Sequence, residues 1–431
     1  MSSIVVDGTP RTFLSPQIIQ HIQKHALQRD SGSFEERNSF IEQRGSTQFF
    51  ESFSLDPPKK CERMYSFPLT SKATPSPSPI EVFDASTFKL RKYRDRSTIY
   101  ISDTTASICF DNMVRIDSFC REVFKRHPVA NSEKTMISLL HHRLAKNNAC
   151  WVPHLECVYF GDTDPDTFRP LDTNADVISH EFGHAVIQYA GGLQYRNQSG
   201  ALNESLADVF AIMTKHYLSK VKANDPNASW LVGEGIVVSD KAKGALRSME
   251  DPGSAYNNPR LGKDPQPKDM SDYRTTSEDH GGVHLYSGIP NRAFCLAAKA
   301  EGGASWEKIG KIWFQALEQG KPDMLFSQFA LHTLRVAHLE YGDNIANIVG
   351  QAWQQVGVNF AKTISLGQLA AFIGGGLGTA FIANTTMVAL MDPEKLTSFK
   401  LGGIILGGCF GGLALANRLE KRNLRALGMQ I

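Results

Sequence analysis

Five consecutive residues, His180-Glu181-Phe182-Gly183-His184, have the types and spacing that metal chemistry needs. On an α-helix, residues four apart share a face, so both imidazoles can bind one Zn²⁺ while Glu181 lies beside the metal-bound water. Apolar neighbours, among them Val177 and Val186, give this helix a side that can pack, and Gly191-Gly192 ends it. The pentad therefore predicts a zinc site on a helix.

Two histidines leave zinc short of a ligand, because catalytic zinc sites usually have three protein ligands and keep one position for water. Glu204 is the next acidic candidate on a helical pattern, whose apolar stripe includes Leu206 and Phe210. Asp208 lies one turn beyond Glu204, so it could accept the other ring N–H of His180. Two histidines, one glutamate and open solvent access predict a hydrolytic site, in which zinc lowers the pKa of water to about 7.

The elements that must position these residues change character along the chain. Short β-rich runs dominate residues 80–162, including Ile80–Phe83, Thr98–Ile101 and Cys157–Phe160. From about Asp172 to Val358 the apolar residues recur at helical spacing. Strands followed by helices predict an α+β architecture, with a β-rich lobe joined to a helical lobe.

The pentad, followed by Asn203-Glu204 and then Asp208, resembles the thermolysin family of zinc metallopeptidases. Other blocks between about Ile80 and Val358 resemble that family in the same order, although Cys150 stands where an aromatic residue is usual. These blocks are Asn147-Asn148-Ala149-Cys150-Trp151, Phe168-Arg169-Pro170-Leu171, Asp176-Val177, Gly192-Leu193-Gln194-Tyr195, Leu246-Arg247-Ser248-Met249, Asp279-His280-Gly281-Gly282-Val283-His284 and Ser287-Gly288-Ile289. The resemblance implies a two-lobed catalytic domain, with an N-terminal lobe over 80–190 that includes the zinc helix and a helical lobe over 191–358.

The resemblance also implies a role for each matching residue. His180, His184 and Glu204 would hold zinc, and Glu181 would be the general base that activates water. His284 and Tyr195 would stabilise the oxyanion, with Asp279 orienting His284, while Asn203 and Asp208 would support the metal ligands. Asn148, Ala149 and Arg247 would bind substrate, and the side-chain pocket would be built from Phe168, Leu171, Val177, Val232 and Leu246. Such a pocket predicts cleavage on the N-terminal side of bulky hydrophobic residues by a neutral endopeptidase.

Calcium is a doubtful cofactor. Asp176 and Glu234 remain where the family binds calcium, but Lys215 stands where a calcium carboxylate is expected. Calcium needs several oxygen ligands. We therefore expect the Lys215 ammonium to substitute electrostatically for the ion.

Residues 1–79 are predicted to be a propeptide and linker. Phe13-Leu14-Ser15-Pro16-Gln17-Ile18, before a helix expected from Pro16, resembles the short propeptide of protealysin-like members, which occupies the cleft until an autoprocessed zymogen loses it. The Pro-, Ser- and Thr-rich stretch Ser66–Pro79 reads as an exposed linker, so we expect processing near Ser66–Ile80. The alternative is a plain disordered tail.

Residues 359–431 are expected to form a hydrophobic helical hairpin outside the usual family domain. Leu366–Met391 and Leu401–Asn417 carry no charged residue, and small residues recur at spacings that let two helices approach closely. With Lys362 before the pair and Arg418 after it, a membrane hairpin with both ends in the cytoplasm is favoured over a soluble helical pair. The first residues lack a conventional secretory signal, so membrane association through the tail is the favoured location, and secretion by a non-classical route the alternative.

Composition restricts the remaining functions. A net charge of +2 over 431 residues, without a basic stripe, argues against a nucleic-acid partner. The seven cysteines are scattered and odd in number, which favours free thiols and folding in a reducing compartment. Three hypotheses remain: an active zinc endopeptidase acting on peptides or proteins, a catalytically silent relative that binds peptides, and a protein whose main functional part is the membrane hairpin.

Overall fold

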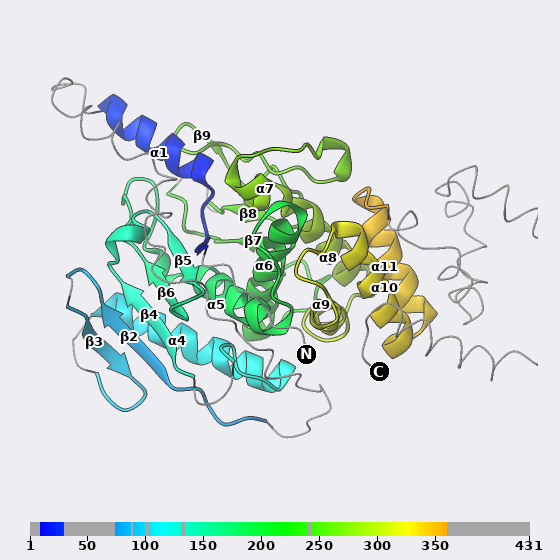
Figure 1. The fold of residues 1–431 in the computed structure, drawn as a ribbon, viewed down its shortest axis with the longest axis horizontal. Coiled ribbons are helices and arrows are strands. Elements are labelled where there is room, and N and C mark those ends of the chain that lie inside the picture. Colours follow the sequence, from blue (N-terminus) through cyan, green and yellow to red (C-terminus); the bar gives the residue numbers. More distant parts are fainter. Residues whose placement is uncertain are drawn as a thin grey trace, which may run out of the picture.

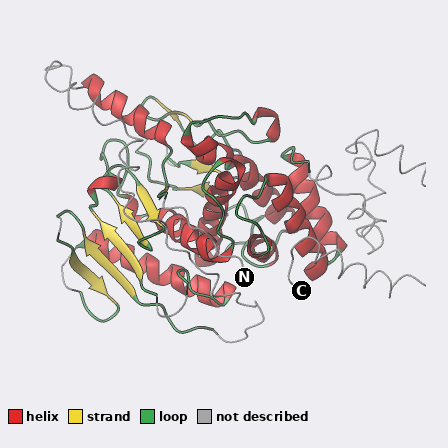
Figure 2. Ribbon diagram, viewed as in Figure 1, coloured by secondary structure: helices red, strands yellow, loops and turns green. Residues whose placement is uncertain are grey.

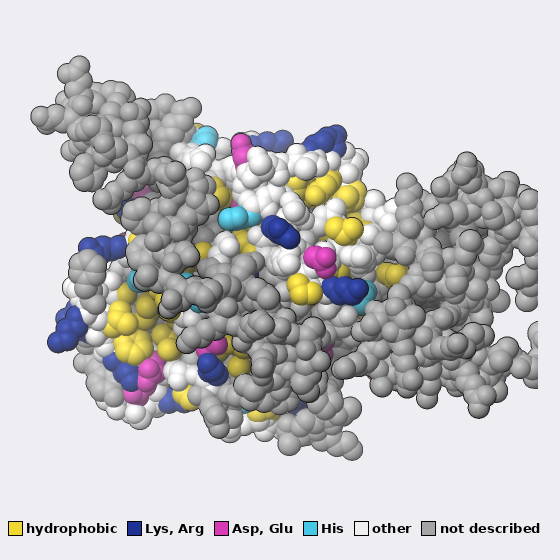
Figure 3. Space-filling view, in the orientation of Figure 1, with side chains coloured by type: hydrophobic (Ala, Val, Ile, Leu, Met, Phe, Trp, Pro, Cys, Tyr) yellow, Lys and Arg dark blue, Asp and Glu magenta, His cyan; other side chains and the backbone are white. Residues whose placement is uncertain are grey.

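The computed structural model describes residues 9–29, 74–87, 89–99, 103–130, 134–238 and 244–359. The predicted hydrophobic hairpin, with both of its uncharged runs, lies outside the described residues. The described chain is mixed α+β, as predicted: strands gather in one lobe and helices in the other, with α5 between them (Figures 1 and 2). Basic and acidic side chains are interspersed over the described part of the face in Figure 3.

The first lobe is built on one six-stranded sheet of order β1-β5-β6-β4-β2-β3. Its strands are β1 (Arg11–Thr12), β2 (Ile80–Asp84), β3 (Arg91–Asp95), β4 (Met136–Leu140), β5 (Ala149–Val152) and β6 (Cys157–Phe160). The pairs β2–β4 and β4–β6 are parallel, and the other three pairs are antiparallel. The edge strand β1 belongs to residues 9–29, which we call the N-terminal segment. This segment therefore forms part of the sheet, next to β5.

A long helix in this lobe is missing from the sequence-based prediction. The helix α4 (Thr104–Phe119) continues into one π-helical turn, η1 (Cys120–Phe124), and Asp103 caps its start by accepting from the Ala106 N–H at 2.9 Å. Its buried residues Cys109, Met113 and Ile116 recur at helical spacing, which the prediction of a strand-dominated lobe overlooked. The predicted strand at Thr98–Ile101 reduces, within the described residues, to one bridge between Ile99 and Arg94.

The central helices are α5 (Ala175–Ala190) and α6 (Asn197–Ser219), and they pack against each other. Asn174 caps α5 by accepting from the backbone N–H groups of Asp176 and Val177. A Cβ atom at Gly183 would lie 3.0 Å from the Ala207 Cα, so the glycine within the pentad allows the two helices to approach closely. This close packing holds His180 and His184 of α5 against Glu204 of α6.

The second lobe follows α6. Short strand pairs come first: β7 (Leu231–Val232) with β8 (Arg247–Ser248), and β9 (Asn257–Asn258) with β10 (Gly262–Lys263). The helices α7 (Asp279–Tyr286), α8 (Gly288–Glu301), α9 (Lys308–Glu318), α10 (Phe326–Tyr341) and α11 (Asp343–Gln355) complete it. Single helical turns lie at η2 (Arg143–Ala145), η3 (Leu171–Thr173) and η4 (Met270–Asp272). Trp313 and Trp353 stack with ring centroids 5.8 Å apart, which ties α9 to α11.

The N-terminal segment carries the predicted helix, α1 (Pro16–Arg29), which projects from the body of the molecule near β9 (Figure 1). The linker predicted to be exposed as far as Pro79 is not exposed throughout. Within its described part, the Ser78 side chain is buried, with 1% exposure. Hydrogen bonds from Ser78 to the Asp117 carboxylate of α4 explain this difference.

Candidate active site

The three predicted metal ligands meet between α5 and α6. The Nε2 atoms of His180 and His184 lie 3.1 Å apart, and each lies 3.4 Å from a carboxylate oxygen of Glu204. One ligand atom from each residue lies within 4.8 Å of the other two, and all three side chains are buried. Residues one helical turn apart on α5 and a carboxylate on the facing helix produce this convergence.

Each histidine is oriented by its second ring nitrogen. His180 Nδ1 lies 2.8 Å from Asp208 Oδ1, and His184 Nδ1 lies 2.8 Å from Asn203 Oδ1. Asn203 in turn donates to the Leu193 carbonyl at 3.1 Å. Because the Nδ1 atoms already have partners, the Nε2 atoms are the ones that point to the centre of the site.

A divalent cation fits this donor set. The buried Glu204 Oε2 accepts no hydrogen bond among the described residues and lies 3.4 Å from His180 Nε2, so this oxygen is available to a cation. Burial lowers the pKa of His184 to about 3, which keeps its ring neutral as a metal ligand must be. Burial also lowers the pKa of His180, but Asp208 and Glu204 outweigh that effect and raise it to about 9. The site therefore favours positive charge at its centre.

Glu181 lies beside this donor set and is completely buried. Its Oε2 accepts from the Trp151 backbone N–H at 2.6 Å, while its Oε1 has no hydrogen-bond partner among the described residues. Burial, with a further contribution from Glu204, raises the pKa of Glu181 to about 8. A carboxylate with one anchored and one unengaged oxygen is suited to exchanging a proton with a neighbouring water.

A third histidine of the site, His284, is held by a turn of residues with positive φ. Asp279, His280, Gly281 and Gly282 all have positive φ, between 52° and 92°, and a Cβ atom at Gly281 would lie 2.2 Å from Asn197 Oδ1. The turn brings Asp279 back onto His284, where its carboxylate accepts from the backbone N–H at 2.9 Å and lies 2.7 Å from Nδ1. Burial lowers the pKa of His284, but Asp279 and Glu204 outweigh it and raise it to about 9.

Residues of the N-terminal segment lie in the cleft as an added strand. Arg11 and Thr12 pair antiparallel with Trp151 and Cys150, and the Phe13 N–H donates to the Ala149 carbonyl at 3.0 Å. Leu14 N donates to Asn148 Oδ1 at 2.9 Å. The Thr12 carbonyl lies 2.6 Å from His284 Nε2.

The Phe13 side chain is fully buried and packs edge-on against the His180 ring at 5.1 Å. Its carbonyl accepts from Arg247 Nη1 at 2.9 Å, and the Arg247 guanidinium lies over its ring. The five predicted pocket residues are buried in the same hydrophobic cluster as Phe13; they are Phe168, Leu171, Val177, Val232 and Leu246. The sequence predicts that a propeptide occupies the cleft, but the register, with Phe13 beside His180, emerges only from the structure.

Asp208 joins the metal ligands to the substrate side of the cleft. Arg247 donates to both of its carboxylate oxygens, each at 2.8 Å, and Asn291 Nδ2 donates to Oδ2 at 2.9 Å. Burial raises the pKa of Asp208, but Arg247 and His180 outweigh it and lower it to about 2. Asn291 has no spacing signal in the sequence that would have identified it.

Tyr195 lies close to the same centre. Its hydroxyl donates to Glu204 Oε1 and lies 3.3 Å from His284 Nε2. The Arg11 guanidinium lies 4.5 Å above its ring. The structure thus brings together the metal-ligand group, Glu181, His284 and Tyr195 around the residues of the N-terminal segment.

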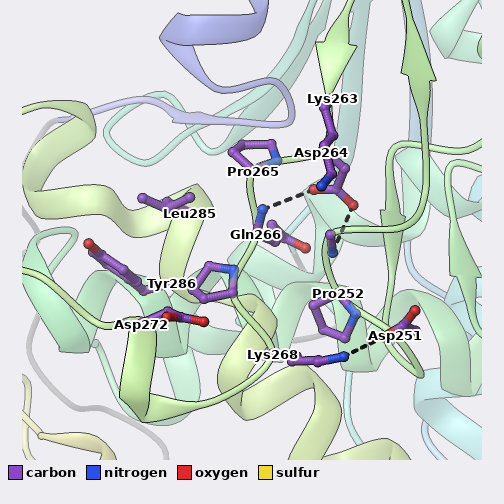
Figure 4. Close-up of a pocket in the computed structure, with 12 residues that line it drawn as sticks. Asp251, Pro252, Lys263, Asp264, Pro265, Gln266, Lys268, Asp272, Leu285 and Tyr286 are labelled. Atoms are coloured by element: carbon purple, nitrogen blue, oxygen red, sulfur yellow. Dashed lines mark hydrogen bonds and ion pairs between the residues drawn. The ribbon is translucent and has the colours of Figure 1, made fainter.

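Gln266 supports His284 from behind and was not predicted. Its Nε2 donates to the His284 carbonyl at 2.7 Å and to Ser287 Oγ at 2.9 Å, and its own N–H donates to Asp264 at 3.1 Å. Figure 4 shows Gln266 and Asp264 in the wall of a surface hollow of about 630 Å³, which Tyr286 and Leu285 also line. Glutamine carries no charge and has no motif here, so its position beside His284 could be found only from the fold.

At the positions where the family binds calcium, Lys215 lies beside the two remaining carboxylates. Lys215 Nζ lies 2.7 Å from Asp176 Oδ2 and 3.4 Å from Glu234 Oε2, and it donates to the Leu231 carbonyl at 2.6 Å. Glu234 N donates to Asp176 Oδ2 at 3.2 Å. The ammonium therefore lies among the oxygens that would face a bound cation.

Two family models match consecutive parts of the chain. The model "Thermolysin metallopeptidase, catalytic domain" matches residues 49–188, and "Thermolysin metallopeptidase, alpha-helical domain" matches residues 191–358. A solved structure, the precursor of protealysin, a metalloproteinase from Serratia proteamaculans, superposes with a TM-score of 0.66 at 34% identity. That match covers 81% of this chain and 99% of the other.

Similar proteins carry protease names. An extracellular metalloprotease of Pectobacterium carotovorum is 41% identical over 242 residues, which are 56% of this chain and 69% of that protein. The protease PrtS of Photorhabdus is 39% identical over 245 residues, which are 56% of this chain and 65% of that protein. The chain thus spans slightly more than two thirds of the first relative and slightly less than two thirds of the second.

The favoured location at a membrane was wrong. The Pectobacterium relative is named as an extracellular enzyme, and so is a minor metalloprotease of Serratia marcescens. Among the described residues, every helix is too short or too polar to cross a bilayer. The first uncharged run is long enough for a membrane span and the second is marginal, but length and hydropathy alone could not identify where the protein resides.

Proposed function

Because the chain belongs to the thermolysin family of metallopeptidases, we propose that it is a zinc-dependent endopeptidase whose N-terminal segment inhibits the precursor. The observation that carries this proposal is the segment Arg11–Leu14, which lies along β5 with the Thr12 carbonyl at His284 and the Phe13 side chain buried. Addition of a strand to an exposed sheet edge is a general way to bind an extended peptide. A substrate would use the same contacts once the segment has left.

The residues His180, His184 and Glu204 would hold the metal, and zinc is the ion that two imidazoles and one carboxylate favour. When bound there, zinc would polarise the substrate carbonyl and lower the pKa of a water. Asp208 and Asn203 would keep the two imidazoles in the orientation that binding requires.

Glu181 would act as the general base and then as the general acid. Its Oε1 would take a proton from the attacking water and pass it to the amine that leaves, while the Trp151 N–H holds Oε2 in place. His284 would donate from Nε2 to the carbonyl oxygen as negative charge develops on it, as it contacts the Thr12 carbonyl here. Asp279 would keep His284 in that orientation, and the Tyr195 hydroxyl would be the second donor.

Substrate choice would be made by the pocket that encloses Phe13. The residue after the scissile bond would donate its N–H to the Ala149 carbonyl, and its own carbonyl would accept from Arg247. The following residue would donate to Asn148 Oδ1, as Leu14 does. Since the pocket is apolar, we propose cleavage on the N-terminal side of bulky hydrophobic residues, with Leu or Phe favoured over Gly by about tenfold or more.

The test is hydrolysis of quenched peptides that differ only in the residue after the scissile bond. We expect the Leu and Phe peptides to be cleaved and Glu181→Gln to lose about a thousandfold in kcat while retaining zinc, because only the proton transfer is removed. Zinc content of both proteins, measured by atomic absorption, is the control. Zinc-loaded, processed enzyme that cleaves none of the peptides would instead support a silent peptide-binding relative.

Inhibition by the N-terminal segment is tested by introducing Phe13→Ala into the inactive Glu181→Gln precursor. The measured quantity is the affinity of each precursor for a labelled peptide that binds in the cleft. Removing a fully buried phenylalanine should weaken the segment by about 3 kcal/mol, so added peptide should compete more easily. Gln20→Ala, an exposed position on α1, is the matched control. Equal peptide binding by the two variants would exclude Phe13 as the anchor of the segment.

A further inference from the structure

A buried carboxylate of the catalytic lobe holds the chain that enters it from the N-terminal segment. Asp117 of α4 is completely buried and accepts from Ser78 Oγ at 2.7 Å and from the Ser78 N–H at 3.2 Å. Arg96 and Arg121 donate to the same carboxylate at 2.9 and 3.1 Å. Hydrogen bonds between charged groups and a buried carboxylate are among the stronger ones in a protein.

The same two arginines also hold the backbone before the sheet. Arg96 Nε donates to the Ser78 carbonyl at 2.5 Å, and Arg121 Nη1 donates to the Pro75 carbonyl at 3.2 Å. His127 Nδ1 lies 2.8 Å from Ser78 Oγ, and burial lowers the pKa of that histidine. Ser78 is not arranged as a nucleophile, because its hydroxyl donates directly to Asp117 and its side chain is buried. We call Asp117, Arg96, Arg121 and His127 the clamp.

The chain joins the sheet directly after the clamp. Met136 N donates to the Pro79 carbonyl at 2.9 Å, and Ile80 pairs with Met136 in the parallel strands β2 and β4. Ile80 is also buried, at 1% exposure. Residues 75–80 are therefore hydrogen-bonded to the catalytic lobe, and two of them, Ser78 and Ile80, are buried in it, while Ser76, Pro77 and Pro79 are exposed.

The contacts of Phe13 define which bonds of this stretch the cleft could hydrolyse. The residue after the scissile bond must donate an N–H to Ala149, which proline lacks, so the bonds before Pro75, Pro77 and Pro79 are excluded. The bonds before Ser76 and Ser78 would offer a small polar side chain to an apolar pocket. Only Pro79–Ile80 has suitable chemistry, and that bond is fixed in the sheet.

We infer that the clamp sets the N-terminal boundary of the mature catalytic domain, so that maturation cuts N-terminal to Pro75 and residues 75–80 stay with the enzyme. The clamp protects Pro79–Ile80 by preventing the local opening that proteolysis requires. This inference rests on the proposed zymogen function. The cut itself is a simple hydrolysis: water gives its hydroxyl to the acyl carbon and a proton to the leaving amine as the C–N bond breaks.

The first experiment determines the N-terminus and intact mass of the matured wild-type chain, alongside Arg96→Gln and the milder Ser78→Ala. We expect the wild type to retain residues 75–80, and both variants to yield a species beginning at Ile80 about tenfold faster, since each loosens the clamp. Arg94→Gln is the matched control, because Arg94 also pairs with α4, through Asp111 at 3.1 Å, without touching residues 75–80. Wild-type enzyme beginning at Ile80, or variants that mature like the control, would overturn the inference.

A second experiment separates this inference from the proposed activity. The Glu181→Gln precursor, with and without Arg96→Gln, is digested with added thermolysin, which cuts before bulky apolar residues. Cleavage at Pro79–Ile80 only in the variant with Arg96→Gln supports the clamp whether or not the chain itself is active. Equal cleavage there with Arg96 intact would refute the clamp even if the wild type proves to be an active zymogen.

Discussion

The helix pair α5–α6 carries two clusters of charged groups, one fully buried and one partly exposed, that neutralise their carboxylates in different ways. At the metal-ligand group, Glu204 faces the Nε2 atoms of His180 and His184, and a cation must come from outside. At the second cluster, Lys215 of α6 supplies its own ammonium to Asp176 and Glu234. Each cluster contains a buried carboxylate, Glu204 or Asp176, that needs a positive partner, but only at the first cluster can that cation be exchanged.

The difference shows what each cluster is suited to do. An ion held by three side chains leaves a coordination position for water and substrate, whereas an ammonium is saturated by the groups that fix it. Lys215 reaches Asp176, Glu234 and the Leu231 carbonyl at once, so its contacts are structural. We propose that this lysine makes the fold independent of calcium, while the first cluster makes the chemistry dependent on zinc.

Selective chelation should produce the largest contrast between the two clusters. We expect 1,10-phenanthroline to abolish peptide hydrolysis, because the metal-ligand group lacks a cation of its own. EGTA, with zinc supplied in the buffer, should leave both the activity and the melting temperature unchanged. Calcium addition to the EGTA-treated enzyme is the control, and a rise in melting temperature with calcium would break the comparison.

Removing the internal cation should affect stability before chemistry. Lys215→Met leaves the buried Asp176 and the partly exposed Glu234 without their partner and should lower the free energy of unfolding by about 1 to 3 kcal/mol. Lys215→Glu should be less stable still but regain part of the loss in millimolar calcium, since it adds carboxylate oxygens. Denaturant melts with and without calcium measure both effects, and a Lys215→Met protein as stable as the wild type would show that the ammonium contributes little.

Residues related by short-range periodicity or covered by the family resemblance could be predicted from the sequence, and those that meet only through the fold could not. The pentad fixes His180 and His184 on one helical face, and Glu204 with Asp208 repeats that logic on the next helix. Lys215 was also expected in place of calcium, because the family resemblance puts it where a calcium carboxylate is usual. Gln266, Asn291 and the clamp at Asp117 have no local pattern, since their partners lie far away in the chain.

The N-terminal segment falls between these cases. A propeptide in the cleft could be expected from its resemblance to protealysin-like members, but not which residue would enter the pocket. The predicted exposed linker was wrong at Ser78, because serine and proline composition does not reveal a buried carboxylate partner 39 residues away. Composition described the local preference of the chain, while hydrogen bonding to α4 decided its burial.

Gln266 tests whether the chemistry near the metal-ligand group also depends on uncharged side chains that hold its neighbour His284 in place. Gln266→Ala removes two hydrogen bonds behind His284, worth roughly 1 kcal/mol each, so kcat should fall about three- to tenfold with little change in KM. Gln266→Glu, which has the same shape but lacks the donors, should lose a similar factor at neutral pH. Peptide kinetics of both variants provide the measurement, and an effect confined to KM would place Gln266 in substrate binding instead.

The smallest expected effect is the change that Lys215→Met makes to the titration of His216, its neighbour on α6. Its ring is buried between Ser305 Oγ and the Ser229 carbonyl, and burial, with a contribution from Lys215, lowers its pKa to about 4. Because the unfolded chain would bind a proton near the usual value of about 6.5, this group stabilises the fold above pH 6.5 and loses that contribution as the pH falls toward 4. The loss should amount to about 3 kcal/mol at most, at about 1.4 kcal/mol for each pKa unit. Lys215→Met should make this loss of stability smaller, because removal of the neighbouring positive charge raises the pKa of His216 toward its usual value. Urea melts from pH 7 to pH 4 on the wild type and Lys215→Met measure the difference, and identical slopes would show that the two neighbours are electrostatically independent.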